Sequence, residues 1–145
     1  YEKLIPKSIF LANQDKKIPI YGSGKNIRDW IFVNDHCDAV SKVMFDGKSG
    51  QSYNISSNNE LSNITIVKKI LEIMNKSNDL IKFVDDRPGH DLRYSLDSSK
   101  IRHSLKWNDK IIFQNGIEKT IDWFLNQTNI QKFSKETHSP TPWKK

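Results

Sequence analysis

The chain has 145 residues, 36% of them hydrophobic and 10% aromatic, which is enough for one modest domain with a core. The mean hydropathy of −0.66 suits a globular chain with polar loops, and the aromatic residues provide core material, which argues against a disordered chain. No apolar run approaches the roughly 20 residues that cross a bilayer. The N-terminus has no signal-peptide pattern, and the single Cys37 excludes an intramolecular disulfide and a multi-cysteine metal site. We therefore expect a cytoplasmic protein.

The net charge of +6 favours an acidic partner, such as nucleic acid, anionic lipid or a phosphorylated small molecule. The Lys and Arg residues are scattered along the chain, and no basic run alternates with aromatic residues. We therefore expect neither a nucleic-acid nor a membrane partner.

The start of the chain predicts a helix followed by two strands. Apolar residues recur at helical spacing over residues 5–12, and Pro6 falls near the first turn, where a missing N–H costs nothing. Residues 17–25 alternate briefly and end in a Gly-Ser-Gly turn. Residues 27–33 form an aromatic and β-branched run that is typical of a strand.

A second helix should follow, capped by Asn34 or Asp35 and ending before Gly47. Its apolar residues recur with the helical period: Val33, Cys37, Val40 and Met44. Residues 51–57 are typical of another strand.

The second half of the chain predicts a third helix, capped by Ser62 or Asn63, and a strand over residues 80–84. The apolar residues of the third helix fall along one stripe: Ile64, Val67, Leu71 and Met74. A short helix near 98–105 and a last helix complete the fold, the latter with Ile117, Ile121, Phe124 and Leu125 on one face. The pattern predicts an α/β (mixed α+β) fold, with one domain over residues 1–126 and a loosely ordered tail over residues 127–145.

Arg28 is a candidate anion ligand, because its guanidinium has a planar fork of donors that suits two oxygens of a phosphate or carboxylate. It stands at the entry to a predicted strand, between Ile27 and Asp29. The alternative is an exposed Arg that pairs with Asp29 or stacks on Trp30.

Arg87 lies in the charge-dense stretch 84–101. The proline after it favours an extended backbone and the next glycine allows a sharp turn, so the guanidinium could be aimed at a fixed point. The alternative is a surface loop in which Arg93 and the neighbouring aspartates form salt bridges. His90 has no partner His or Cys at ligand spacing, so we predict no metal site.

Asn63 stands where the third helix should begin, and the N–H groups of a helix N-terminus can bind phosphate; an ordinary N-cap is the alternative. The sequence contains no G-x-G-x-x-G fingerprint and no Ser/His/Asp arrangement, and residues 21–25 do not form a Walker A motif. The residues by themselves indicate an anion-binding α/β domain without visible catalytic machinery.

Several motifs occur together in one order: EKLIP (2–6), PIYGSGKNIRDWIFVNDH (19–36), YNI (53–55), DRPGHDLRY (86–94), KI (100–101), LKW (105–107) and GIEKTIDWF (116–124). In this order they resemble the C-terminal portion of dTDP-glucose 4,6-dehydratases, a family of extended short-chain dehydrogenases. IRDWIFVNDH is shared with many sugar-nucleotide epimerases and decarboxylases, whereas DRPGHDLRY points to the dehydratases. The resemblance implies a substrate-binding portion whose upstream NAD-binding Rossmann domain is absent from this sequence.

The resemblance also implies which residues bind the substrate: Lys3, Leu4, Pro19, Ile20, Tyr21, Arg28, Asn63, Arg87 and His90. By similarity, Lys3 and Leu4 lie beside the nucleotide, and Pro19, Ile20 and Tyr21 line the thymine pocket. Arg28, Asn63 and Arg87 address the diphosphate, and His90 lies close by in the same loop as Arg87.

In that family, NAD oxidises the sugar at C4, water is eliminated across C5 and C6, and hydride returns to C6, so that dTDP-glucose becomes dTDP-4-keto-6-deoxyglucose. The Tyr-x-x-x-Lys pair and the glycine fingerprint belong to the missing half, so the resemblance implies no catalytic or NAD-binding residue in this chain and no activity for it alone. A dTDP-sugar is the implied partner, and the full-length form is expected to be a homodimer. The alternatives are part of a UDP-sugar epimerase or decarboxylase, or a sugar-nucleotide-binding module without catalysis.

Overall fold

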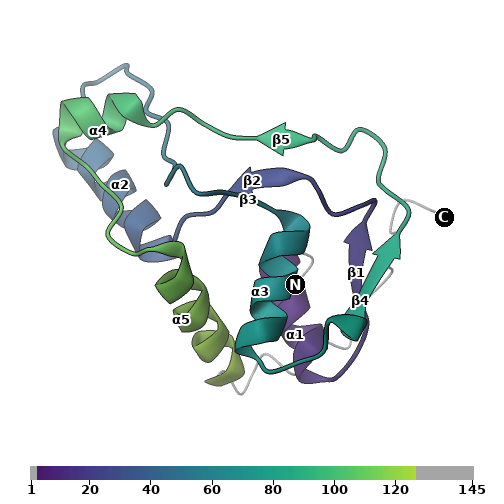
Figure 1. Cartoon of the computed structure of the whole chain (residues 1–145). Coiled ribbons are helices and arrows are strands. Elements are labelled where there is room, and N and C mark those ends of the chain that lie inside the picture. The colour runs from purple at the N-terminus through teal and green to yellow at the C-terminus, as the bar shows by residue number, and fades with distance from the viewer. Residues whose placement is uncertain (1–2, 127–145) are drawn as a thin grey trace. The chain divides into compact units, whose positions relative to one another are not determined.

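The computed structural model describes residues 3–126 and has helices interspersed with short strands (Figure 1), which confirms the predicted α/β class. The elements in chain order are α1 (Leu4–Asn13), β1 (Ile18–Tyr21), β2 (Ile27–Asp29), α2 (Val33–Asp46), β3 (Glu60–Ser62), α3 (Asn63–Ile73), a 3-10 helix (Asn78–Leu80), β4 (Ile81–Val84), β5 (Arg93–Tyr94), α4 (Ser99–Leu105) and α5 (Phe113–Asn126). The predicted tail at 127–145 lies outside the described residues. Within the described part, no helix has the length and apolar character needed to cross a membrane.

The chain divides into two compact units. Within the described residues, the first unit contains 3–26, 62–92 and 118–126, and the second contains 27–61 and 93–117. The chain therefore leaves the first unit after Asn26 and returns to it at Ser62. The domain that we predicted over 1–126 stays a prediction.

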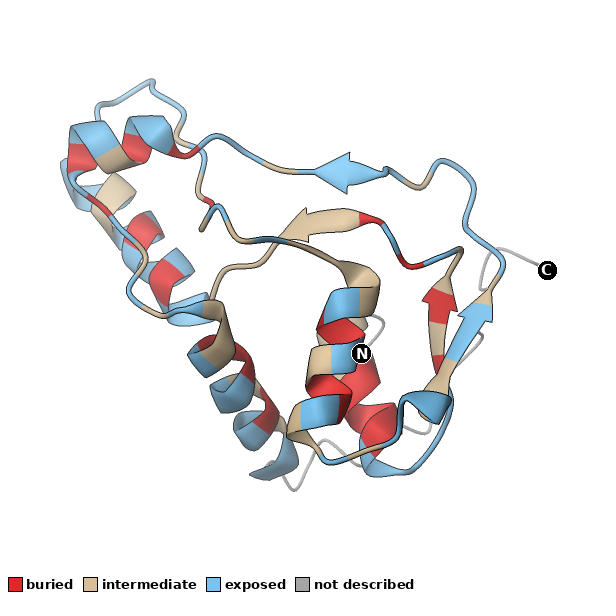
Figure 2. Ribbon diagram, in the orientation of Figure 1, coloured by how far each residue is buried: buried red, intermediate tan, exposed pale blue. Residues whose placement is uncertain are grey.

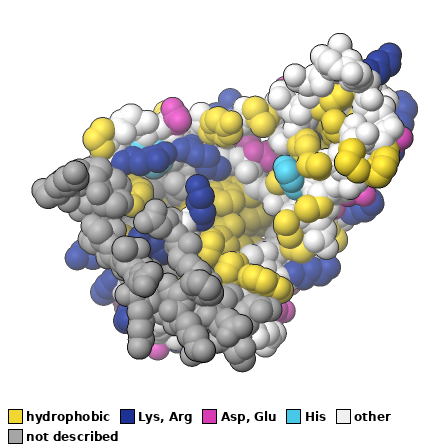
Figure 3. Space-filling model, turned by 180° about the vertical axis from the view of Figure 1, so that it is seen from behind, with side chains coloured by type: hydrophobic (Ala, Val, Ile, Leu, Met, Phe, Trp, Pro, Cys, Tyr) yellow, Lys and Arg dark blue, Asp and Glu magenta, His cyan; other side chains and the backbone are white. Residues whose placement is uncertain are grey.

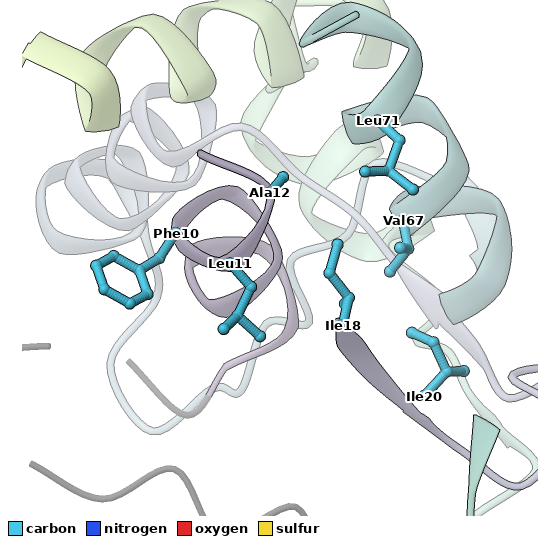
Figure 4. Close-up of a cluster of buried hydrophobic side chains, with 7 residues drawn as sticks. All are labelled: Phe10, Leu11, Ala12, Ile18, Ile20, Val67 and Leu71. Atoms are coloured by element: carbon cyan, nitrogen blue, oxygen red, sulfur yellow. The ribbon is translucent and has the colours of Figure 1, made fainter. Parts of the chain in front are cut away.

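The first unit is built on a parallel pair of strands, β1 and β4, in which Ile18 lies opposite Ile81 and Tyr21 lies opposite Val84. Helices α1 and α3 pack against each other, and α1 also contacts β1. Their shared core consists of Phe10, Leu11, Ala12, Ile18, Ile20, Val67 and Leu71 (Figure 4). Because side chains alternate along a strand, Ile18 and Ile20 enter this core, while Pro19 and Tyr21 remain half-buried.

The second unit contains a three-stranded sheet in the order β3-β2-β5, in which β2 and β5 run parallel. Ile27 lies opposite Arg93, and Arg28 lies opposite Tyr94. The core of this unit consists of Ala39, Ile101, Leu105 and Trp107, and four half-buried residues pack against it: Ile31, Val43, Tyr53 and Ile55.

Several local predictions are confirmed. Helix α1, strands β1 and β4, and helices α4 and α5 form where the sequence predicted them. Helix α3 begins after Ser62, whose Oγ accepts a hydrogen bond from the Thr65 N–H (3.3 Å) and so acts as its N-cap. The run at 27–33 gives only the three-residue strand β2.

The prediction for helix α2 is partly wrong. The helix ends at Asp46 as expected, but its N-cap is Phe32, so neither Asn34 nor Asp35 caps it. Asp35 is instead buried, and its Oδ2 accepts a hydrogen bond from the Ile111 N–H (2.9 Å). The apolar residues at helical spacing are exposed, and Asp35 and Ala39 are the buried residues of this helix.

The strand predicted at residues 51–57 is absent from both sheets of the described chain. Its composition is suited to a strand, but a strand also needs a neighbour that takes up its backbone hydrogen bonds. The described residues provide no such neighbouring strand for this segment.

Gly24 provides a test of the first unit's packing. It has φ +69°, and a Cβ at this position would lie 2.7 Å from Ile20 Cγ2 and 2.9 Å from Ile64 Cβ. We expect Gly24→Ala to lower the free energy of unfolding by about 2–4 kcal/mol, since both a left-handed backbone and a clash oppose it. Urea unfolding measures the change.

Gly50→Ala is the matched control. Gly50 has a similar φ of +75°, and a Cβ there would meet nothing within 4 Å. Gly50→Ala should therefore lower the free energy of unfolding only through the left-handed backbone, by about 1 kcal/mol. Equal losses in the two variants would contradict the close contact between the turn and α3.

Candidate functional site

The candidate site lies in the first unit, at the carboxyl ends of the parallel strands β1 and β4. Strand β1 ends at Tyr21, and the charge-dense loop 85–92 follows β4. The Gly22 N–H donates to the Val84 carbonyl (2.9 Å), and a Cβ on Gly22 would lie only 2.8 Å from Asp86 Oδ2. The glycine thus lets the turn after β1 and the loop after β4 approach each other. Ligands of open α/β sheets commonly bind at such strand ends.

Asp86 is the centre of the loop. Its Oδ1 lies 2.6 Å from His90 Nδ1 and also accepts a hydrogen bond from the Arg87 N–H (2.8 Å). The hydrogen bond with His90 is the main cause that lowers the pKa of Asp86, and the Arg87 N–H contributes in the same direction. The Asp86 carboxylate therefore stays ionised and holds the start and the middle of the loop together.

The His90 side chain is only 6% exposed, although the loop around it is largely exposed. Its ring meets the Tyr21 ring edge to face, with centroids 6.3 Å apart and planes at 81°. His90 thus links the Asp86 carboxylate to the side chain at the end of β1. This contact restricts the orientation of the Tyr21 ring.

Asn26 joins the three segments that form the site. It is 6% exposed, and its backbone carbonyl accepts a hydrogen bond from the Asn63 N–H (3.0 Å). Its side-chain Nδ2 donates to the Asp91 carbonyl (3.1 Å). The turn after β1, the start of α3 and the far end of the loop are therefore tied to one buried residue.

The first N–H groups of α3 are already occupied. The Asn63 N–H donates to the Asn26 carbonyl, the Ile64 N–H to the Gly24 carbonyl (2.9 Å), and the Thr65 N–H to Ser62 Oγ. The prediction that these N–H groups are available to a phosphate is therefore wrong. Asn63 is half-buried and can contribute its side-chain amide instead.

The other predicted residues of the first unit have different surroundings. Lys3 is exposed at the N-cap of α1, and Leu4 packs against the core. Ile20 is 2% exposed with its side chain in the core, so only its backbone can face a ligand. Arg87 is exposed, and within residues 3–126 its guanidinium takes part in no hydrogen bond or ion pair.

Arg28 belongs to the second unit. It is half-buried on β2, and its Nη1 donates to the Ile27 carbonyl (2.6 Å). Asp29, the partner that the sequence suggested as an alternative, accepts hydrogen bonds from the Ser57 N–H (2.9 Å) and Oγ (3.0 Å) through Oδ1. The Trp30 Nε1 donates to the Leu61 carbonyl (3.0 Å).

Arg93 forms an ion pair with Glu60 rather than with the aspartates of the loop, so the predicted salt-bridged loop is wrong in this respect. Arg93 Nε donates to Glu60 Oε2 and Nη2 to Oε1, both at 2.6 Å, and Ser95 Oγ donates to Oε1 (2.8 Å). These bonds lower the pKa of Glu60 from 4.5 to about 2. Since Glu60 lies on β3 and Arg93 on β5, the pair spans β2, the strand that carries Arg28.

Asn26, Glu60 and Asp86 were not predicted from the sequence as residues that shape the site. Asn26 follows a glycine turn and has the composition of an ordinary loop residue, and Glu60 is separated from its partner by 33 residues. The one usable signal was the Asp86–His90 spacing of four residues around a Pro-Gly pair, which brings the two side chains together when the loop turns sharply. Among residues 3–126, no group of three or more His, Cys, Asp or Glu side chains could hold a metal ion.

Comparison with known proteins identifies the family. Residues 1–120 match the sequence model of the GDP-mannose 4,6 dehydratase family. The chain belongs to this family. The predicted resemblance to dTDP-glucose 4,6-dehydratases is also confirmed. The enzyme of Haemophilus influenzae is 46% identical over 135 residues, and that of Xanthomonas campestris pv. campestris is 41% identical over 140 residues.

Solved structures agree with this assignment. The dTDP-glucose 4,6-dehydratase of Bacillus anthracis in complex with NAD matches 87% of this chain with a TM-score of 0.83 and 39% identity. DesIV of Streptomyces venezuelae, a dTDP-glucose 4,6-dehydratase with NAD and TYD bound, matches 87% with a TM-score of 0.84 and 34% identity. The UDP-glucose 4-epimerase of Thermotoga maritima, at 21% identity and a TM-score of 0.79, shares the fold.

The chain spans only part of these relatives. The matches cover 86% of this chain but 40% of the Haemophilus enzyme, and 90% of this chain but 40% of the Xanthomonas enzyme. The solved dehydratases are covered to 40% and 39%. More than half of each relative therefore has no counterpart in this sequence.

The Glu60–Arg93 pair predicts a dependence of stability on pH. The folded-state pKa of Glu60 is lowered from 4.5 to about 2, so the pair stabilises the fold fully above pH 4.5, and this contribution is lost as the pH falls toward 2. We expect Glu60→Gln to remove this part of the acid-induced fall in the free energy of unfolding, and Arg93→Met to remove the larger share of it, because the Ser95 hydrogen bond to Glu60 remains. Urea unfolding between about pH 7 and pH 2 measures it.

The double variant Glu60→Gln/Arg93→Met is the control for this pair. It should show the same pH dependence as Glu60→Gln, because without the Glu60 carboxyl group there is nothing left for Arg93 to pair with. Single variants that keep the full wild-type pH dependence would contradict the role assigned to the pair.

Proposed function

We propose that this chain is the nucleotide-sugar-binding part of a dTDP-glucose 4,6-dehydratase, a lyase that converts dTDP-glucose to dTDP-4-keto-6-deoxyglucose. The observation that carries the proposal is the arrangement at the ends of β1 and β4, where Asn26 joins Asn63 to the loop that carries Arg87 and His90. The 41–46% identity to curated dTDP-glucose 4,6-dehydratases supports the same substrate.

The diphosphate of the substrate would bind to Arg87, Asn63 and Arg28. Arg87 offers an exposed guanidinium whose donor fork suits two phosphate oxygens. The side-chain amide of Asn63 can donate one further hydrogen bond, while the backbone N–H groups of α3 are engaged within the protein. Arg28, on the strand spanned by the Glu60–Arg93 pair, would provide a second guanidinium.

The base and the sugar-proximal part of the nucleotide would contact the end of β1 and the start of α1. The Tyr21 ring is oriented by His90, which in turn is held by Asp86, so its position is set before the ligand binds. Pro19 would add an apolar contact and Ile20 a backbone contact. Lys3 and Leu4 would lie beside the nucleotide.

The start of α3 does not offer the free N–H groups that a dinucleotide uses. The phosphates of a dinucleotide commonly bind to free backbone N–H groups at the start of a helix. Here the Gly24 carbonyl of the glycine turn accepts the hydrogen bond of the Ile64 N–H in the first turn of α3. In the proposed full-length enzyme, NAD and the catalytic residues would belong to the part of the relatives that this chain does not span. That enzyme would be a cytoplasmic homodimer.

Binding of dTDP-glucose to the 145-residue chain tests the proposal. We expect Arg87→Ala to weaken binding by about 10- to 100-fold, or roughly 1.4–2.8 kcal/mol, since a charged hydrogen-bonding partner of the diphosphate is lost. Isothermal titration calorimetry measures the affinity.

Lys16→Ala is the matched control, because it also removes one exposed positive charge from the first unit. Lys16 precedes the start of β1, whereas the candidate site lies at the end of this strand. If both variants weakened dTDP-glucose binding equally, the effect of Arg87→Ala would come from the loss of net charge and not from a contact with the diphosphate. Tighter binding of UDP-glucose than of dTDP-glucose would favour the epimerase alternative. Formation of a 4-keto sugar by the chain with NAD would contradict the assignment of catalysis to the missing part.

A further inference from the structure

The three-stranded sheet of the second unit is held differently on the two sides of its middle strand, β2. On the β3 side, the Trp30 N–H donates to the Asn59 carbonyl (3.1 Å), and the Trp30 Nε1 donates to the Leu61 carbonyl (3.0 Å). Asp29 Oδ1 accepts a hydrogen bond from the Ser57 N–H (2.9 Å). This side of β2 is therefore fixed by contacts to the segment that leads into β3 and to β3 itself.

On the other side of β2, strand β5 has little apolar contact to hold it. Both of its residues, Arg93 and Tyr94, are exposed, and Figure 2 shows the contrast with the half-buried β2. Leu92 and Leu96, which lie before and after the strand, are 71% and 37% exposed. Because the burial of apolar area contributes little here, the position of β5 depends on polar contacts.

Glu60 provides three such contacts. Its carboxylate on β3 accepts hydrogen bonds from Arg93 Nε and Nη2 (both 2.6 Å) and from Ser95 Oγ (2.8 Å). Lys and Arg side chains appear at several places on the face drawn in Figure 3, and exposed ion pairs are usually weak. A carboxylate that accepts a two-bond fork from Arg and a further bond from a hydroxyl is geometrically more specific than such a pair. We call Glu60, Arg93 and Ser95 the Glu60 clamp.

The Glu60 clamp lies on the face of the sheet opposite to the Arg28 side chain. Arg93 is paired with Ile27, and Tyr94 is paired with Arg28. Paired residues of neighbouring strands point to the same face, whereas successive residues of one strand point to opposite faces. The Arg93 side chain therefore points to the Ile27 face, and the side chains of Arg28 and Tyr94 point to the other face. Arg93 is thus not placed to share an anion with Arg28.

The Arg28 guanidinium follows the backbone of β2. Its Nη1 donates to the Ile27 carbonyl (2.6 Å), so the head of the side chain is tied to the strand that carries it. Ile27 is also the residue that is paired with Arg93. A displacement of β5 would therefore act on Ile27 and, through its carbonyl, on the Arg28 guanidinium.

We propose that the Glu60 clamp positions the Arg28 guanidinium, our candidate ligand for the diphosphate of the nucleotide sugar. The clamp connects the two outer strands across β2, keeps Ile27 in place beside Arg28, and acts from the face that does not carry Arg28. Its three members are thus positioning residues rather than ligands of the diphosphate. A guanidinium that is held in place before binding loses less entropy when it meets an anion. The inference rests on the proposed function, which assigns the diphosphate to Arg28.

The order of the Arg28 side chain in the ligand-free 145-residue chain is the first test. The variant is Glu60→Gln, because Gln keeps the size of the side chain but loses the carboxylate. Measured by ¹⁵N relaxation, the order parameter of the Arg28 Nε–H group should fall by about a third or more, as for a group that changes from rigid to flexible. Ser95→Ala, which removes one of the three hydrogen bonds, should produce a smaller fall.

Asp38→Asn is the matched control for Glu60→Gln. Asp38 lies in the same unit and forms an ion pair with Lys110 (3.2 Å), so this variant also removes one carboxylate and one ion pair. It should leave the order parameter of the Arg28 side chain unchanged.

Binding of dTDP-glucose to the folded variants, measured by isothermal titration calorimetry, is the second test. Glu60→Gln should weaken binding by about 5- to 10-fold, although its net charge is more positive and by itself favours an anionic ligand. In an Arg28→Ala background the same change should have no further effect, because the group that the clamp positions is gone. Asp38→Asn, which changes the net charge equally, should not weaken binding.

Two outcomes would overturn the proposal. The first is an unchanged Arg28 order parameter in a folded Glu60→Gln chain. The second is equal weakening of binding by Glu60→Gln with and without Arg28→Ala, which would mean that the clamp supports the unit as a whole. If Glu60→Gln does not fold, Ser95→Ala provides both measurements. A wild-type chain that does not bind dTDP-glucose, together with the expected fall in Arg28 order, would contradict the proposed function and support the positioning of Arg28.

Discussion

The candidate site depends on the two hydrogen bonds of the buried Asn26. Its backbone carbonyl accepts from the Asn63 N–H and so fixes the start of α3. Its side-chain amide donates to the Asp91 carbonyl and so fixes the far end of the loop. These contacts join segments that are up to 65 residues apart in the sequence. A buried amide that loses a partner costs about 1–3 kcal/mol, so the arrangement is specified rather than incidental.

This constraint gives an exposed loop a defined shape. A loop with so few apolar contacts would ordinarily be mobile, and each ordered residue costs conformational entropy. Here the Asp86–His90 bond holds the middle of the loop, the Tyr21 ring packs on His90, and Asn26 holds the end. Arg87 is thereby presented from a fixed backbone, which lowers the entropy that an anion must overcome on binding.

The sequence predicted the features that depend on neighbouring residues. The Ser62 cap, the period of α3 and the alternation in β1 are local, and all three are found. The Arg93–Glu60 pair and the contacts of Asn26 could not be predicted, because their partners are distant in the chain and nothing local specifies them. The resemblance to a family suggested which residues meet, but not that the N–H groups of α3 are occupied.

Helix α2 and segment 51–57 show a different limit of sequence patterns. The period of α2 located an apolar stripe correctly, yet periodicity does not tell which polypeptide covers it. The composition of 51–57 was that of a strand, yet pairing requires a neighbour. Both segments lie in the second unit, and in both the outcome depends on neighbours that a local pattern does not specify.

The central claim, that Asn26 holds the loop in its binding shape, is tested most directly by backbone ¹⁵N relaxation of residues 86–91. Asn26→Ala keeps the carbonyl that Asn63 uses and removes only the bond to Asp91. The account predicts that order parameters of the loop fall from about 0.85 in the wild type to below about 0.6 in the variant, while those of β1 and β4 stay unchanged. A folded variant whose loop is as ordered as that of the wild type would contradict it.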